Sequence, residues 1–228
     1  MSATPRDFQR ARRPEHKQER RRAILDAARA LAEERPVRDV SLGDLARRVG
    51  LAKSAVLRYF ESREDVYLQL TAAEWEAWVA EAVPRIRAAA PSAERATAEL
   101  AATLTARPLL CDLVSQTASV LEHNVSAEAA RRFKAATLVH VATVGEALAA
   151  AVPGLAPDAA REVSALAMVL VAGMWPMATP APEVVAMLAA DPAMAHAQVD
   201  IEPRVARALA ALAKGLQTTA TLADAEAP

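Results

Sequence analysis

Residues 41–60 (SLGDLARRVGLAKSAVLRYF) constrain the fold of this chain more than any other segment, because they predict two short helices joined at a glycine. Ser41 can cap the first helix through its hydroxyl, and Asp44, three residues later, can complete a capping box. Gly50 follows that helix, where the chain must leave through a left-handed conformation that a Cβ would disfavour. The pattern therefore predicts a helix-turn-helix unit.

The two predicted helices each have an inner and an outer face. Apolar residues of the first helix fall on one side: Leu42, Leu45, Ala46 and Val49. In the second helix, Val56 and Phe60 lie four residues apart and should pack inward. The side chains left outside can bind phosphates or base edges: Lys53, Ser54, Arg58 and Tyr59. The second helix is thus expected to enter a DNA groove, and an ordinary helical hairpin is the alternative.

The segments on either side of this unit strengthen the first interpretation. Residues 23–31 pair small and aliphatic side chains, and residues 60–65 (FESRED) place an aromatic ring before a short capped turn. With these segments, the chain from about Arg20 to about Leu70 resembles the TetR family of bacterial transcription regulators. The resemblance implies an all-α fold, in which an N-terminal three-helix helix-turn-helix DNA-binding domain precedes a larger C-terminal helical domain for ligand binding and dimerisation.

Some positions depart from the family pattern. Leu57 replaces a tyrosine whose hydroxyl reaches a phosphate, and Tyr59, where the family often has histidine, could partly substitute. Arg63 replaces a lysine and keeps its charge, while Pro36 replaces the glycine that ends the first helix and also stops a helix. We predict DNA contacts from these residues: Arg22, Ser41, Lys53, Ser54, Ala55, Arg58, Tyr59 and Arg63.

The net charge of −1 hides an asymmetry along the chain. Residues 1–66 hold 16 Lys and Arg against 11 Asp and Glu, whereas the remainder holds 11 against 17. A basic module attracts DNA, so we expect residues 1–18 to form a flexible basic arm that contacts phosphates or the minor groove. A solvated tail is the alternative. We place the DNA-binding domain at 19–66 and the ligand-binding and dimerisation domain at 67–228.

Composition indicates a helical, cytoplasmic protein. The hydrophobic fraction is 53%, while aromatic residues, which favour strands, make up only 4%. A single cysteine leaves no disulfide and no cluster spaced for zinc, so we predict no metal site and no cofactor. The first two dozen residues are charged and lack the apolar stretch of an export signal.

Beyond residue 65 the pattern is one of long amphipathic helices separated by proline-containing breaks. The predicted helices run towards Pro84, from Pro91-Ser92 through Leu104, over 108–123 as one helix or two, over 127–152, over 157–175 and over 203–217, with an ordered excursion at 176–202. Residues 163–182 carry no charge, but their prolines and flanking acidic residues argue against a membrane span. A helix so apolar can face both its own core and a partner chain. The family resemblance assigns dimerisation to 127–152 and 157–175.

No motif encodes an effector pocket. Large, polarisable or hydrogen-bonding side chains on otherwise aliphatic helices are our candidates for ligand contacts: Trp75, Trp78, Cys111, Gln116, His123, His140, Met168 and Trp175. Each could equally belong to the core. As a set they imply a mostly apolar ligand with few polar anchors.

We therefore expect a ligand-responsive transcriptional regulator, namely a homodimeric repressor that binds a palindromic operator and is released by a small apolar effector. One alternative is a helical module that binds protein, which would lack the steep salt dependence of DNA binding. Another is an enzyme with Cys111 as nucleophile and His123 or His140 as base. Cys111 lies among leucines and valine, where a thiol acts more often as a small hydrophobe, so no enzymatic activity is predicted.

Overall fold

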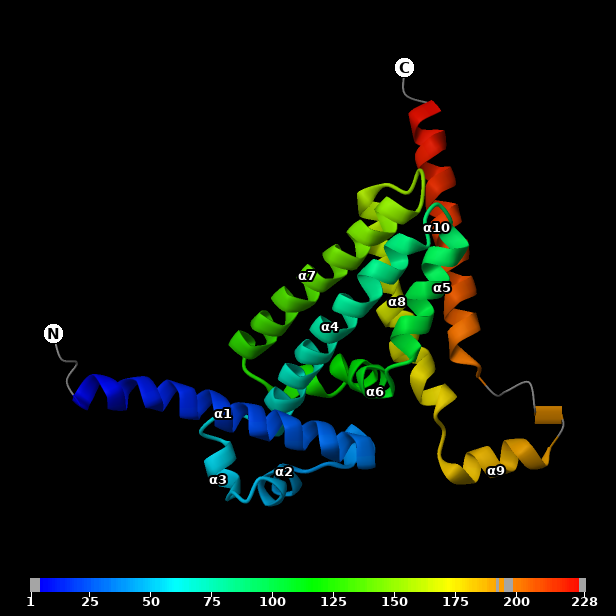
Figure 1. Ribbon diagram of the computed structural model, residues 1–228. Helices are drawn as coiled ribbons and strands as arrows, with labels where there is room; N and C mark the ends of the chain where they lie inside the picture. Colours follow the sequence, from blue (N-terminus) through cyan, green and yellow to red (C-terminus); the bar gives the residue numbers. More distant parts are fainter. Residues whose placement is uncertain (1–4, 192, 195–198, 226–228) are drawn as a thin grey trace. The chain divides into compact units, whose positions relative to one another are not determined.

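A computed structural model describes residues 5–191, 193–194 and 199–225, with side chains described from residue 15 to residue 217 in these ranges. Within them the chain forms helices and no strands, which confirms the all-α prediction. In chain order the elements are α1 (Pro5–Glu34), η1 (Val37–Asp39), α2 (Leu42–Arg48), α3 (Lys53–Val56), α4 (Arg63–Ala88), α5 (Ala93–Thr105), α6 (Pro108–Thr117), η2 (Leu121–Asn124), α7 (Ala127–Ala151), α8 (Pro157–Ala178), α9 (Pro182–Ala190) and α10 (Ile201–Ala225) (Figure 1).

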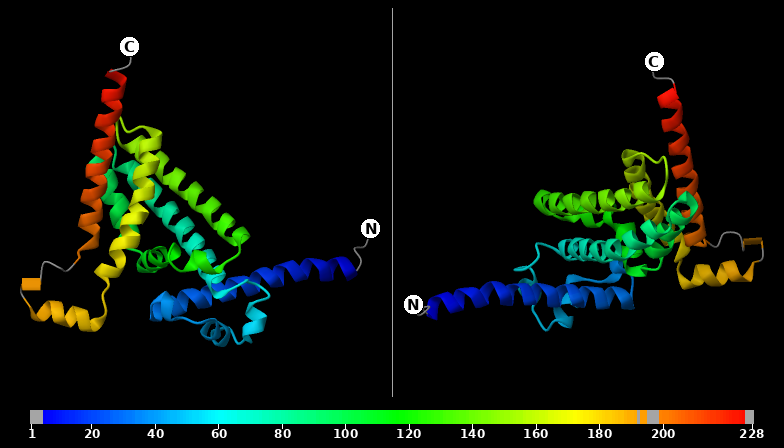
Figure 2. Two further views of the ribbon diagram at one scale, coloured as in Figure 1. Left: turned by 180° about the vertical axis from the view of Figure 1, so that it is seen from behind. Right: turned by 45° about the horizontal axis from the view of Figure 1, so that its top comes forward.

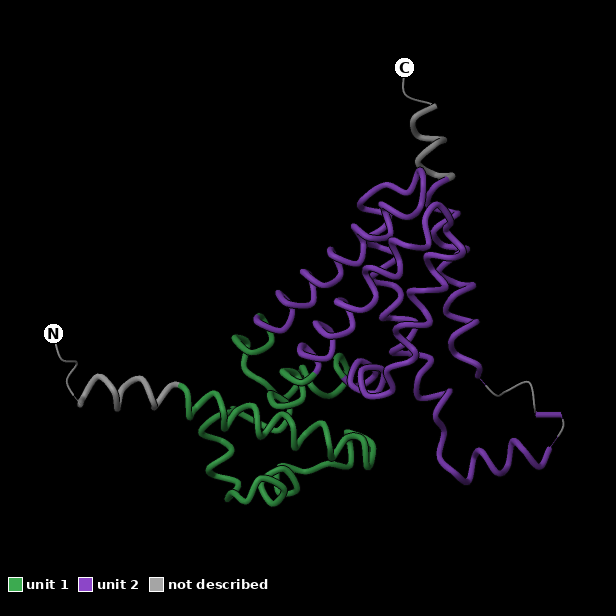
Figure 3. Tube along the Cα trace, in the orientation of Figure 1, with its two compact units in different colours: residues 1–70, 117–131 green, residues 71–116, 132–228 purple. Residues whose placement is uncertain are grey.

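The chain divides into two compact units (Figure 3). The first, here called the DNA-binding unit after the function predicted from its sequence, contains Met1–Leu70 and Thr117–Arg131. The second, here called the C-terminal unit, contains Thr71–Gln116 and Arg132–Pro228. A piece of the C-terminal half of the sequence, Thr117–Arg131, therefore groups with the N-terminal residues.

The DNA-binding unit is built on α1, which packs against α2, and α2 packs against α3. Its core consists of side chains with 5% exposure or less from these helices, from the segment after α3 and from the start of α4: Ile24, Ala28, Leu31, Leu45, Val56, Phe60, Val66 and Tyr67. Helix α1 is longer than predicted, because it runs without interruption from Pro5. Residues 5–18 of the predicted flexible arm are therefore helical, and residues 1–4 lie outside the described residues.

In the C-terminal unit, α10 packs along α5 and α8, as both views in Figure 2 show. One apolar core joins these helices to α4, α6 and α7. Trp78 lies in this core, and its indole N–H donates to the Thr103 hydroxyl at 3.2 Å. Gly145 allows α7 to approach α8 closely, because a Cβ at this position would lie 2.9 Å from the Cα of Arg161.

The two helix ends that were predicted at prolines are wrong. α4 continues through Pro84 to Ala88, and α8 continues through Pro176 to Ala178. A proline inside a helix loses one backbone hydrogen bond, but burial of the next turn can compensate for that loss. In α4 that turn contains Ile86, whose side chain is fully buried.

The excursion after α8 contains the apolar helix α9, in which no described side chain is buried. No single helix of the described chain is long and apolar enough to cross a bilayer. α8 and α9 taken together reach that length and composition, although the chain bends by 73° between them.

Candidate DNA-binding interface and effector-site residues

The start of α2 has the predicted capping box. The Ser41 hydroxyl oxygen accepts from the backbone N–H of Asp44 at 3.2 Å, and the Asp44 carboxylate accepts from the backbone N–H of Ser41 at 2.8 Å. The Ser41 N–H, together with the Ser41 hydroxyl and Arg35, lowers the pKa of Asp44 to about 2. The carboxylate is therefore charged at neutral pH, and it supports the positive end of the helix dipole. Ser41, a predicted DNA contact, thus serves the cap in this structure.

The turn between α2 and α3 has the geometry that its glycine predicts. Gly50 has a φ of +65°, in the left-handed region. The Leu51 N–H donates to the Ala46 carbonyl at 2.8 Å, and the Gly50 N–H donates to the Arg47 carbonyl at 3.2 Å. These two bonds form a Schellman motif, which satisfies the last carbonyls of α2.

Helix α3 is shorter than predicted, since it covers only Lys53–Val56. Its preceding residue, Ala52, has no side-chain acceptor to cap it. The following residues keep a tight helical path, in which the Tyr59 and Phe60 N–H groups donate to the Val56 carbonyl at 2.9 and 3.2 Å. We call residues 53–60 the reading segment.

The reading segment has the predicted orientation. Val56 and Phe60 are buried, with 0% and 2% exposure. Of the predicted contacts, Lys53, Ser54 and Arg58 are exposed, and Ala55 and Tyr59 are half-buried. The Lys53 side chain lies across α2, because a Cβ on Gly43 would be 2.8 Å from its Cε. Exposed cationic and hydroxyl groups on a segment held by two buried anchors suit contacts to DNA phosphates and base edges.

Arg21 on α1 holds the end of the reading segment, a role that the sequence analysis missed. Its guanidinium lies 4.5 Å from the centroid of the Phe60 ring and donates to the Tyr59 carbonyl and to the Gln69 side-chain carbonyl. The sequence around Arg21 contains many basic residues, so no sequence signal distinguished its role. Arg22, the predicted contact beside it, is exposed.

Arg63 was predicted to contact DNA, but the structure directs it into the DNA-binding unit. Its guanidinium donates to the carbonyls of Val37 and Val40, pairs with Glu64 at 3.0 Å and lies 4.9 Å from the centroid of the Tyr67 ring. Arg63 therefore fixes the chain around η1, and its guanidinium N–H groups bind acceptors within the DNA-binding unit.

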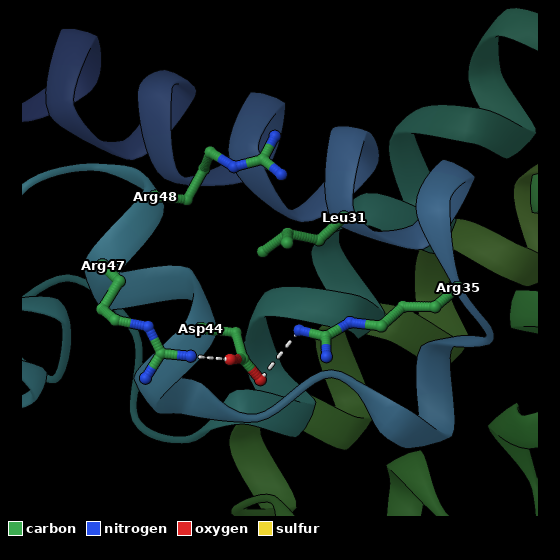
Figure 4. Close-up of a pocket in the computed structure, with 5 residues that line it drawn as sticks. All are labelled: Leu31, Arg35, Asp44, Arg47 and Arg48. Carbon is green, nitrogen blue, oxygen red and sulfur yellow. Dashed lines mark hydrogen bonds and ion pairs between the residues drawn. The ribbon is translucent and has the colours of Figure 1, made fainter.

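Arginines at the end of α2 form a basic surface in addition to the reading segment, and this surface was not predicted from the sequence. An open hollow of about 430 Å³ is lined by Leu31, Arg35, Asp44, Arg47 and Arg48 (Figure 4). Arg35 and Arg47 both pair with Asp44, and Arg48 pairs with Glu34 at 2.6 Å. The consecutive arginines in the last turn of α2 were the available sequence signal. Arg47 remains largely exposed and can reach a phosphate.

The candidate effector residues do not form one group in the structure. Most are buried in the core of the C-terminal unit: Trp75, Trp78, Cys111, Gln116 and Met168. His140 and Trp175 are half-buried, whereas His123 is exposed and belongs to the DNA-binding unit. His140 stacks on Trp75 with ring centroids 5.8 Å apart, and burial lowers the pKa of its imidazole, although Glu76 opposes this shift. His123 thus belongs to a different compact unit from the other candidates.

Cys111 has the environment of a structural thiol. It is fully buried, and its Sγ donates to the Leu104 carbonyl at 3.3 Å. Burial, with the nearby charge of Asp112, raises the pKa of the thiol to about 12. The thiol is protonated at neutral pH, which argues against the nucleophile required by the enzyme alternative.

Comparisons with known proteins cover both units. Residues 24–70 match the sequence model described as "Bacterial regulatory proteins, tetR family", and residues 72–220 match "Tetracyclin repressor-like, C-terminal domain". No curated protein matches the chain.

Two solved structures share the fold. A TetR transcriptional regulator from Rhodococcus sp. RHA1 is 15% identical, with a TM-score of 0.57 over 87% of this chain and 97% of that one. The TetR family repressor AlkX from a Dietzia strain, implicated in biodegradation of n-alkanes, is also 15% identical, with a TM-score of 0.52 over 87% of this chain and 95% of that one.

Proposed function

Because this chain belongs to the TetR family of bacterial transcriptional regulators, we propose that it is a repressor that binds a palindromic operator as a homodimer and is released by a small, mostly apolar effector. One observation carries the DNA-binding part of this proposal. The capping box, the left-handed Gly50 and the buried Val56 and Phe60 together leave Lys53 and Arg58 exposed on one segment.

In this proposal the reading segment lies in the major groove of one half-site. Arg58 contacts a base edge, because a guanidinium can bind guanine through two parallel hydrogen bonds. Lys53, Ser54 and Arg47 contact phosphates, which set the position of the helix but carry no sequence information. The basic residues up to Arg22 add further sequence-independent affinity.

The proposed dimer forms through α7 and α8. Large apolar side chains stand exposed on both helices, with exposed fractions of 68% for Leu138, 63% for Val139 and 62% for Val169. Met168, next to Val169, is buried in the chain's own core. α8 thus has one apolar face towards its core and apolar residues on the other side, as expected for a helix that also contacts a partner.

The proposed effector binds in the C-terminal unit. The core of this unit holds Trp75 and Trp78, and Trp175 packs against it. The half-buried His140, stacked on Trp75, offers a polar group at the edge of this core. A site that has few polar groups among aliphatic side chains suits a mostly apolar ligand. Because the two sites are coupled, operator binding must weaken effector binding by the same factor by which the effector weakens operator binding.

Selection of operators from random-sequence DNA with the full-length protein tests this function. We expect a palindromic sequence, protected in footprints and bound by two chains, with affinity that falls steeply as salt rises. Arg58→Ala should lose about 1–3 kcal/mol of discrimination at one base pair of each half-site. Arg87→Ala, which removes an exposed arginine from the C-terminal unit, is the matched control. Absence of any enriched sequence would contradict the proposal.

A further inference from the structure

The segment of residues 117–131, here called the strap, belongs to a different unit from its neighbours in the chain. It groups with the DNA-binding unit, whereas residues 71–116 and 132–228 form the C-terminal unit (Figure 3). The chain therefore passes between the units in three places, at 70–71, 116–117 and 131–132. α6 runs into the strap at one end and α7 begins in it at the other.

The strap is held to the end of the reading segment by a hydrogen bond. The Glu61 carboxylate accepts from the backbone N–H of Ser126 at 2.6 Å, across 65 residues of sequence. Glu61 directly follows Phe60, the last residue of the reading segment. Leu121 and Ala129, with 0% and 4% exposure, bury the apolar side of the strap.

Glu61 completes the cap of α7. The Ser126 hydroxyl oxygen accepts from the Ala129 N–H at 3.1 Å, so Ser126 is the N-cap residue. In a capping box, a Glu or Gln three residues later accepts from the N–H of the cap residue. Here that position is Ala129, whose side chain has no acceptor, and Glu61 of the same unit supplies the missing carboxylate. Its negative charge also favours the positive end of the α7 dipole.

Glu61 is itself fixed in a network that includes the reading segment. Its backbone N–H donates to the Asp65 carboxylate at 3.1 Å, and Asp65 accepts from the Gln69 amide at 2.8 Å. Gln69 in turn accepts from Arg21, which also binds the Tyr59 carbonyl. Displacement of the start of α7 therefore acts on Glu61 and on the adjoining backbone of the reading segment.

We propose that Glu61 is a positioning residue that transmits the state of the C-terminal unit to the reading segment through its bond to Ser126. This inference rests on the proposed function, because it explains how effector and operator binding are coupled. The end of α6 and the start of α7 are covalently part of the strap, so a shift of either helix changes the Glu61–Ser126 bond. By reciprocity, operator binding must then alter the strap.

Hydrogen exchange of the full-length protein, with and without the selected operator duplex, tests the inference. In the wild type we expect operator to slow exchange of backbone amides in residues 117–131 by about 5-fold or more. Glu61→Ala should raise exchange in the free strap by about 2- to 5-fold, as expected for loss of a carboxylate at a helix start, and should abolish the response to operator. Glu61→Gln keeps an acceptor oxygen and should keep the response.

Glu128→Ala is the matched control, because it also removes a carboxylate from the start of α7 but leaves the Glu61–Ser126 bond intact. It should raise exchange in the free strap by a similar factor and retain the operator response. A wild-type strap that does not respond to bound operator would overturn the inference and leave the proposed function standing. Equal exchange in the free straps of wild type and Glu61→Ala would also overturn it. Failure to select any operator would instead contradict the proposed function.

Discussion

α2–α3 and α7–α8 are both helix pairs joined at a left-handed glycine, yet their outer surfaces differ. Gly50 and Gly154 have φ values of +65° and +76°. Around Gly50 the exposed side chains include the cations Lys53 and Arg58 beside the apolar Leu57, whereas α7 and α8 expose Leu138 and Val169. In the proposed function, the pair around Gly50 meets a polyanion and the pair around Gly154 meets the apolar surface of a partner chain. Outer side chains, and not the turn, decide the kind of partner.

The largest expected effect comes from a charge on the apolar pair. Val169→Glu would place a carboxylate without a partner in the proposed dimer contact, and we expect it to weaken the dimer by about 3–5 kcal/mol. Light scattering over a range of concentrations measures the shift. Glu162→Gln, at an exposed position of the same helix, should leave the dimer intact. A Val169→Glu protein that remains as dimeric as the wild type would place the interface elsewhere.

A smaller effect is expected at the close approach of α7 to α8. Gly145→Ala would bring a Cβ within 2.9 Å of the Arg161 backbone, so we expect a loss of about 1–3 kcal/mol in the free energy of unfolding. Gly215→Ala is the control, because a Cβ there meets nothing within 4 Å. It should be neutral or stabilise α10. Denaturant unfolding compares the two variants, and equal stability would show that α7 and α8 separate easily.

The two turn glycines allow a direct comparison. A Cβ at Gly50 or Gly154 meets nothing within 4 Å, so Gly50→Ala and Gly154→Ala should each cost only the left-handed backbone strain, about 1–2 kcal/mol. Thermal unfolding measures this loss. Only Gly50→Ala should also lower operator affinity, because it displaces the reading segment. Equal operator affinities in the two variants would show that the turn does not set the position of α3.

The smallest effects concern two carboxylates, the half-buried Asp44 and the exposed Glu94, one in each unit, whose pKa values are lowered to about 2. At Asp44 the main cause is the backbone N–H of Ser41, and at Glu94 it is the hydrogen bond from Lys214. Both values lie below the ordinary 3.8 and 4.5, so each group stabilises the fold above those values and loses this contribution as pH falls towards about 2.

NMR titration of both carboxyl groups at low and high salt distinguishes the two causes. We expect added salt to raise the pKa of Glu94 more than that of Asp44, because salt screens an exposed ion pair and leaves a backbone hydrogen bond in place. Asp44→Asn and Glu94→Gln should remove the corresponding acid dependence of the melting temperature. Equal salt shifts would mean that Arg35, and not the cap, dominates at Asp44.

Structural features that depend on residues close together in the sequence were predicted, whereas features that depend on tertiary packing were not. The capping box at Ser41, the turn at Gly50 and the inward packing of Val56 and Phe60 were all predicted, and each depends on residues within five positions of one another. The end of α3 was not predicted, because no side chain caps this short helix and its length depends on tertiary packing. The effector site has no comparable local signal, since a buried Trp or Met looks the same in a core and in a pocket.

The sequence by itself therefore determined the helix-turn-helix unit, the helical class and most helix starts, because caps, glycines and i, i+4 pairs act within one or two turns. Only the tertiary structure decided that Arg21 and Arg63 turn inward, that Met168 faces the core while Val169 faces out, and that Glu61 caps α7. The contacts of Arg21 and Glu61 join residues 38 and 65 positions apart. No local pattern encodes such pairs, because they exist only once the helices have packed.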